Sequence, residues 1–209
     1  MSDDFYSIRT MSWKNNDVGG SIEFEIICCG HKSDGSFDLS CEIASLSGFI
    51  LDLGYYPTVR DIGVFQAFDM RSGHAVDTFR VITKRRSMIK RVLPDLDMDF
   101  TGTFIHLEKL WVREDFRGNR LGLRLMREAR NMFGRFGSLA LLKAHPDGDQ
   151  TSDDDCRRLA RYYQSDRVAG FRPLSARGEP GWLVADWYDP GTYGDDTSYW
   201  SPAKSPDRC

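Results

Sequence analysis

The segment 107–122 constrains the fold more than any other part of the chain, because it predicts a strand, a turn and a helix in direct succession. Alternation predicts that one face of the strand carries Phe104, His106, Glu108, Leu110 and Val112. The turn contains Arg117, Gly118, Asn119 and Gly122, and an amphipathic helix begins near Arg120. Backbone N–H groups and the helix dipole then converge on one place, which predicts a site for a phosphorylated ligand.

The segment 112–122 resembles the acetyl-coenzyme A (acetyl-CoA) binding motif of the GNAT superfamily of N-acetyltransferases. The family pattern is Val-x-Pro-x-x-(Arg/Gln)-x-x-Gly-x-(Gly/Ala), and two positions of this chain depart from it. Glu114 stands where proline is common, and Arg120 stands where the middle glycine is usual. A side chain at Arg120 can crowd a close phosphate, yet it also brings a cation that could pair with that phosphate.

A second stretch, from Leu159 to Phe171, is similar to the family's other motif, Ala-x-x-x-Tyr-x-x-x-Gly-Phe. This chain carries two or three additional residues, around 166–169, before Gly170. The flanking pattern predicts a helix that ends at Gly134 or Gly137, a strand at 138–143, a second helix capped near Ser152 and a last strand at 182–185. This order fits the C-terminal half of the family, and the resemblance covers about residues 62–186.

The resemblance implies an α+β fold (α/β three-layer) with a GNAT-like mixed, mostly antiparallel central sheet flanked by helices. We expect a single domain over 1–209. It divides into a variable, strand-rich N-terminal part (1–60), an acetyl-CoA-binding core (62–186) and an irregular tail (187–209).

The N-terminal part has strand signals that the family does not have at this place. Segments 5–13, 21–28 and 37–44 read as strands, and the last two form an extra hairpin. Segments 61–68 and 75–84 read as a further hairpin before the coenzyme-binding strand. Two helices usually shape the acceptor pocket in the family, so acceptor specificity does not carry over.

Composition limits the class of protein. The chain has 209 residues, 41% hydrophobic and 28% charged, which is ordinary for a soluble globular protein. A net charge of −3 argues against nucleic acid as a partner, although the basic segment 83–91 could bind an anion or be a solvated insertion. No stretch suits a membrane span or a signal peptide, so a cytoplasmic location is expected.

The five cysteines are odd in number and scattered, which argues against a disulfide framework. Cys28 and Cys29 are adjacent on a predicted strand and therefore point to opposite faces. No metal site is expected, and the thiols are interpreted as structural.

The resemblance implies direct acetyl transfer from acetyl-CoA to an amine. It assigns the pyrophosphate to one group of residues: Arg117, Gly118, Asn119, Arg120, Leu121 and Gly122. Backbone groups of Leu110 and Val112 would run beside the pantetheine arm, and the Val112 N–H would polarise the thioester carbonyl. Tyr163 matches the tyrosine that protonates the departing thiolate, whereas Tyr162 fits the core better.

An alkylamine is mostly protonated at neutral pH, so a base must take its proton. Glu108 and His106 occupy the positions where family members often place that base, and ordinary polar roles remain open for both. The expected function is an acetyl-CoA-dependent N-acetyltransferase that acts on a primary amine of a small molecule or protein. The alternative is a catalytically silent acyl-CoA-binding sensor or scaffold. A homodimer is also open, because family members often dimerise.

Overall fold

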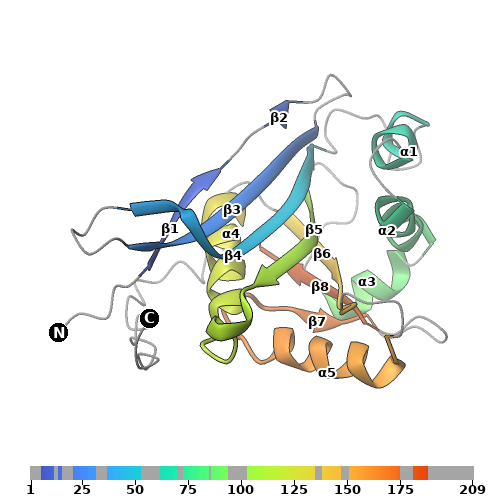
Figure 1. Ribbon diagram of the computed structural model, residues 1–209. Helices are drawn as coiled ribbons and strands as arrows, with labels where there is room; N and C mark the ends of the chain where they lie inside the picture. Colours follow the sequence, from blue (N-terminus) through green and yellow to red (C-terminus); the bar gives the residue numbers. More distant parts are fainter. Residues whose placement is uncertain are drawn as a thin grey trace.

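The computed structural model describes residues 6–11, 14–15, 21–31, 37–52, 62–69, 73–84, 86–93, 103–134, 138–146, 151–174 and 181–187. These residues form one eight-stranded sheet with helices on both faces (Figure 1). Residues 188–209, which make up nearly all of the expected tail, lie outside the described part.

The sheet has the strand order β1-β3-β4-β5-β6-β8-β7, and β2 pairs with β3. Among the described strands, β5 and β6 are the only parallel pair, and the other pairs are antiparallel. The strands are β1 (Tyr6–Met11), β2 (Lys14–Asn15), β3 (Ser21–His31), β4 (Phe37–Asp52), β5 (Thr103–Val112), β6 (Ser138–Lys143), β7 (Arg172–Pro173) and β8 (Trp182–Asp186).

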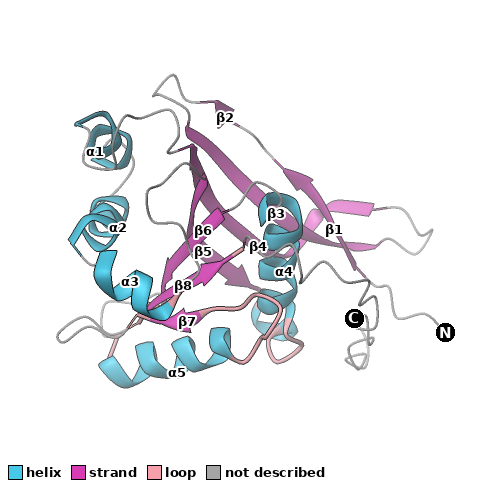
Figure 2. Ribbon diagram, turned by 180° about the vertical axis from the view of Figure 1, so that it is seen from behind, coloured by secondary structure: helices cyan, strands magenta, loops and turns pink. Residues whose placement is uncertain are grey.

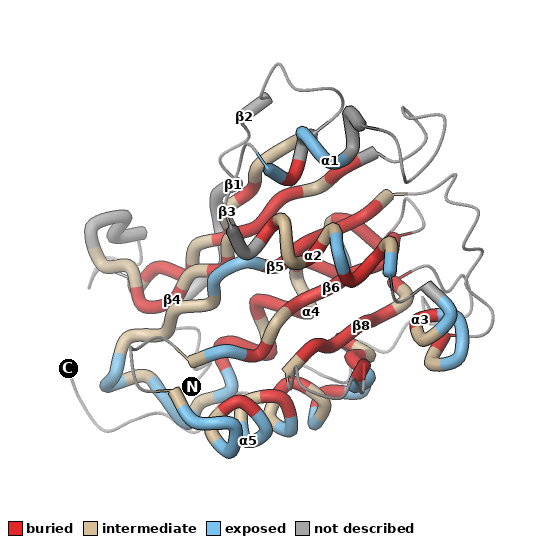
Figure 3. The backbone as a smooth tube through the Cα atoms, turned by 90° about the vertical axis from the view of Figure 1, so that its right-hand side faces the viewer, coloured by how far each residue is buried: buried red, intermediate tan, exposed pale blue. Residues whose placement is uncertain are grey.

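Helices cover the two faces of the sheet in separate groups (Figure 2). α4 (Leu121–Phe133) and α5 (Asp153–Gln164) pack on one face, and their buried side chains join one hydrophobic cluster. α1 (Ile62–Asp69), α2 (Gly73–Lys84) and α3 (Arg86–Val92) pack on the other face over a second cluster. Figure 3 shows the strands buried between these layers. The predicted class, a mixed and mostly antiparallel sheet flanked by helices, is confirmed.

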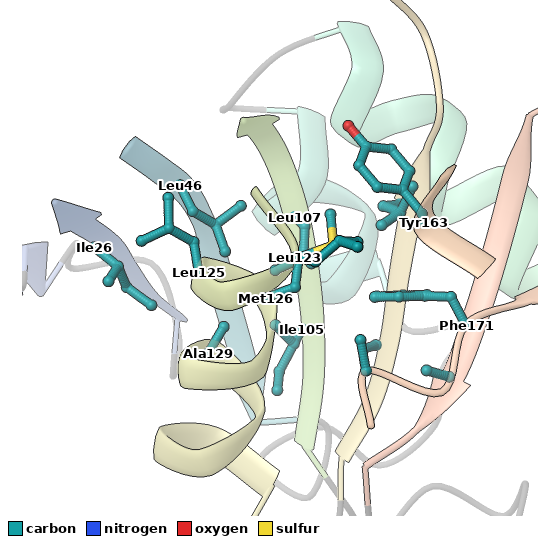
Figure 4. Packing of buried hydrophobic residues seen from close by; sticks show 14 of the residues in the cluster. Ile26, Leu46, Ile105, Leu107, Leu123, Leu125, Met126, Ala129, Tyr163 and Phe171 are labelled. Atoms are coloured by element: carbon teal, nitrogen blue, oxygen red, sulfur yellow. The ribbon is translucent and has the colours of Figure 1, made fainter. Parts of the chain in front are cut away.

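α4 forms because its apolar residues recur on one stripe of a helix. Leu125, Met126 and Ala129 are almost wholly buried against the sheet (Figure 4). Phe133 closes the stripe with its ring centroid 4.6 Å from that of Phe24 on β3. The helix stops at the first of the two predicted end points, with Gly134 as its C-cap.

α5 begins at the predicted cap. The Ser152 hydroxyl oxygen accepts a hydrogen bond from the Asp155 N–H, and the Asp155 carboxylate accepts one from the Ser152 N–H, which completes a capping box. Asp166 holds the additional residues around 166–169, which follow the helix, in place. Its carboxylate accepts the N–H groups of Val168 and Ala169 at 2.9 and 3.0 Å. It also pairs with Arg127 of α4 at 2.7 Å, so the insertion is anchored to the core.

The prediction of a strand hairpin at 61–68 and 75–84 is wrong, because these segments form α1 and α2. β-Branched residues favoured strands there. The buried residues of α2 are Ala75, Thr78, Val81 and Ile82, whose spacing is that of a helix face. The N-terminal hairpin is confirmed and is longer than predicted. β4 continues through Asp52 and joins the core sheet directly beside β5.

Candidate functional site

The two parallel strands at the centre of the sheet separate at their C-terminal ends. β5 pairs with β6 from Thr103 to Leu107, opposite Ser138 to Leu142, and β5 then continues to Val112 beside β4 alone. A cavity of about 590 Å³ opens at this point, bounded by both strands, the turn after β5 and α5. The strand ends therefore frame a cleft with backbone groups on its wall.

A β-bulge at Glu108 sets the direction of β5 within this cleft. Leu107 pairs with Gly48 and Lys109 pairs with Ser47, so Glu108 is the extra residue. Gly48 is required for this approach, because a Cβ there would lie 2.0 Å from the carbonyl oxygen of His106. A glycine inside a strand pattern is the one sequence signal that could have indicated the bulge.

The bulge overturns the prediction that His106 and Val112 share a strand face. Leu107, Leu110 and Val112 pack with the cluster under α4 and α5. His106 instead lies on the opposite face, 3.1 Å from the Thr78 hydroxyl of α2 and edge-on to Phe49. His106 does not line the cavity, whereas Glu108, at the bulge, is exposed and does.

The backbone of β5 beyond the bulge presents hydrogen-bonding groups to the cleft. The Arg113 N–H donates to Ile43 of β4 at 2.9 Å. Successive residues of a strand turn their N–H groups to opposite edges, so the N–H groups of Val112 and Leu110 face the edge away from β4. The Arg117 side chain reaches the same edge, where its Nε donates to the Val112 carbonyl at 3.2 Å.

The turn from β5 into α4 places the start of the helix, at Leu121 and Gly122, on the wall of the cavity. It contains a short 3-10 helix (Glu114–Phe116) and two residues of left-handed backbone, Gly118 at φ +85° and Arg120 at φ +57°. Arg120 is the N-cap, and no side chain of the turn caps α4 from that position. A Cβ at Gly122 would lie 2.7 Å from a Leu110 methyl group, so this glycine allows the helix to approach β5.

The cavity wall carries more positive than negative charge. Its basic side chains are Lys109, Arg117, Arg120, Lys143 and Arg158, and its carboxylates are Glu108 and Asp155. One of these carboxylates, Asp155, pairs with Arg158 at 2.9 Å. The net charge of the whole chain is −3, so the cavity is a local positive region in an acidic protein, which suits an anionic ligand.

Two neighbouring tyrosines of α5 line the cavity. Tyr163 is 7% exposed, and Figure 4 shows its hydroxyl directed away from Phe171. Tyr162 is half-buried, and its hydroxyl oxygen accepts a hydrogen bond from the Leu123 N–H in the first turn of α4. Burial raises the pKa of the Tyr162 phenol, partly offset by this hydrogen bond and by the Arg120 charge.

The structure brings most of the predicted site residues together at this cavity: Glu108, Leu110, Val112, Arg117, Gly118, Arg120, Leu121, Gly122 and Tyr163. Asn119 does not line it and instead braces the turn, where its Nδ2 donates to the Phe116 carbonyl at 3.3 Å. The sequence reasoning missed Lys143, His145 and Arg158, because no motif links the end of β6 to one face of α5.

The described residues were also compared with the requirements of a metal site and of a membrane-spanning helix. They include no group of three or more histidine, cysteine, aspartate or glutamate side chains placed to hold a metal ion. None of the helices described has both the length and the apolar character that crossing a membrane requires.

Comparisons with known proteins give weak matches. No family model matches the chain, and no curated protein matches it in sequence. Among solved structures, the chain is similar to AtaTR bound with AcCoA, with a TM-score of 0.38, 11% identity, and coverage of 79% of this chain and 68% of that one. It is also similar to AtaT complexed with acetyl-methionyl-tRNAfMet, with a TM-score of 0.38, 12% identity, and coverage of 78% and 71%. Similarity at this level carries no argument about function.

Proposed function

We propose that the protein is an acetyl-CoA-dependent N-acetyltransferase that acts on a primary amine of a small molecule or protein. One observation carries the proposal: the cleft between β5 and β6 meets the first turn of α4, whose N-cap side chain makes no capping hydrogen bond, in a cavity rich in cations. An elongated ligand with an anionic group in its middle and an extended amide arm fits such a cavity.

The residues around the cavity fit coenzyme A group by group. The first turn of α4, with Arg117 and Arg120, would hold the pyrophosphate, because backbone N–H groups and cations both favour an anion there. The edge of β5 at Leu110 and Val112 would pair with the amides of the pantetheine arm, since its N–H groups face the cleft. The bound acetyl thioester supplies the acyl group and the leaving thiol.

Three groups of this chain would manage charge and protons during the transfer. The Val112 N–H would donate to the carbonyl oxygen as negative charge develops on it. Glu108 would accept the proton that the attacking amine releases, directly or through water. Tyr163 would donate its phenolic proton to the departing sulfur as the carbon–sulfur bond breaks.

A catalytically silent acyl-CoA-binding sensor or scaffold is the alternative. It would need the turn and the cations but neither Glu108 nor Tyr163. A Tyr163→Phe variant separates the two functions: an enzyme should keep its affinity for acetyl-CoA and lose turnover in an assay of thiol release with a panel of amines. Thiol release that needs no amine, or that Tyr163→Phe leaves unchanged, would reject this assignment of the chemistry.

The binding half of the proposal is tested by calorimetric titration of acetyl-CoA. We expect micromolar affinity in the wild type and a loss of about tenfold in Arg117→Glu, because a cation at the anion site becomes an anion. The matched control is Arg157→Glu, which reverses an exposed charge on α5 outside the cavity. Equal effects of both substitutions would indicate general electrostatics instead of a site at the turn.

A further inference from the structure

Tyr162 connects α5 to the first turn of α4, a position that the helical pattern assigned to the core. Its ring packs beside the hydrophobic cluster under α4 and α5. Its hydroxyl oxygen accepts the Leu123 N–H and would lie 3.4 Å from a Cβ placed on Gly122. The ring is therefore held by packing, with the hydroxyl fixed at the helix N-terminus on the wall of the cavity.

The O–H group of Tyr162 can still donate a hydrogen bond to a ligand. A phenol has one O–H donor as well as an acceptor oxygen, and here the oxygen is engaged by Leu123. Within the described ranges, no hydrogen bond in which Tyr162 is the donor is found. The positive charge of Arg120 acts on the same hydroxyl, and the positive end of the α4 dipole lies beside it.

We propose that Tyr162 is a ligand-binding residue whose O–H donates to a phosphate oxygen of the coenzyme while its oxygen holds the Leu123 N–H. The inference rests on the proposed function and adds a residue that the motif does not contain. Accepting the backbone N–H polarises the phenol and makes it a better donor. Because burial raises its pKa, the phenol keeps its proton at neutral pH and remains a donor.

The test compares two acetyl donors in a Tyr162→Phe variant, which keeps the ring and removes the hydroxyl. Acetyl-CoA carries the pyrophosphate, and acetyl-pantetheine lacks it. We expect the Kd for acetyl-CoA to weaken about ten- to a hundredfold, the range for hydrogen bonds to charged groups. We expect kcat/KM with acetyl-pantetheine to stay within about twofold of the wild type. Arg161→Gln, on an exposed position of the same helix outside the cavity, should change neither value.

Comparing the loss of affinity for acetyl-CoA with the loss of kcat/KM for acetyl-pantetheine separates a contact with phosphate from a structural effect. Loosening of α4 after loss of its hydrogen bond to Tyr162 would weaken both donors alike, so equal losses would overturn the inference. An unchanged Kd for acetyl-CoA in Tyr162→Phe would also overturn it, while the proposed function would stand. If wild-type protein fails to bind acetyl-CoA, the proposed function fails and the inference fails with it.

Discussion

Arg120 offers a perturbation whose effects on stability and on binding should have opposite signs. Its backbone lies at φ +57° and ψ +21°, the left-handed region, where a Cβ costs about 1–2 kcal/mol. Glycine removes that strain. It also raises the conformational entropy of the unfolded chain, which destabilises the folded state by about 0.4–1 kcal/mol. We therefore expect Arg120→Gly to raise the free energy of unfolding by about 0.5–1 kcal/mol, or about 1–4 °C in Tm.

Arg120→Ala is the matched control, because it removes the same guanidinium and keeps the Cβ. Thermal and urea unfolding should give no stabilisation for alanine, while calorimetry should show the same loss of acetyl-CoA affinity in both variants. Equal stability of the alanine and glycine variants would refute the argument, since it would mean that the backbone at this position is not held in the left-handed region.

Three further predictions concern the scaffold. Gly48→Ala places a Cβ 2.0 Å from the His106 carbonyl and should cost about 3–5 kcal/mol by urea denaturation; a cost under about 1 kcal/mol would contradict the bulge. Asp166→Ala should cost about 3 kcal/mol, because it removes the ion pair with Arg127 and the carboxylate oxygen that accepts the N–H groups of Val168 and Ala169. Asp154→Ala on the surface should cost under about 0.5 kcal/mol. Burial is the main cause that raises the pKa of the Cys28 thiol from 9.0 to about 12, and the nearby Cys29 adds to it. Cys28 should therefore stay a neutral thiol and resist alkylation by iodoacetamide at pH 8, measured in a Cys209→Ser background. The unfolded chain loses this proton first, so the contribution of Cys28 to stability should fall as pH rises from 9 toward 12; rapid native labelling of Cys28 would contradict its burial.

The elements predicted correctly are those that local signals determine. The end of α4 at Gly134 and the start of α5 at Ser152 follow from cap residues, which act within one helical turn. The turn between Val112 and Gly122 follows from charges and glycines that interrupt an alternating pattern. Each of these features depends on neighbours in the sequence, so one sequence is enough to indicate it.

The features that could not be predicted depend on contacts between distant residues. The bulge at Glu108 exists because Gly48, sixty positions earlier, lets two strands approach closely, and it moves His106 to the other face of the sheet. α2 is a helix despite its β-branched residues because Thr78, Val81 and Ile82 are buried against β5 and the rest of the second cluster. Tertiary burial thus overrode local propensity in α2, and a close approach between two distant strands set the face on which His106 lies.

Hydrogen–deuterium exchange with and without acetyl-CoA tests the central claim most directly, because it locates the ligand on the backbone. We predict slower exchange at two places, the β5–α4 segment 108–123 and the end of β6 at 142–145, with no change in α1 and α2. Protection confined to α1 and α2, or no protection at saturating acetyl-CoA, would contradict a coenzyme site between β5 and β6.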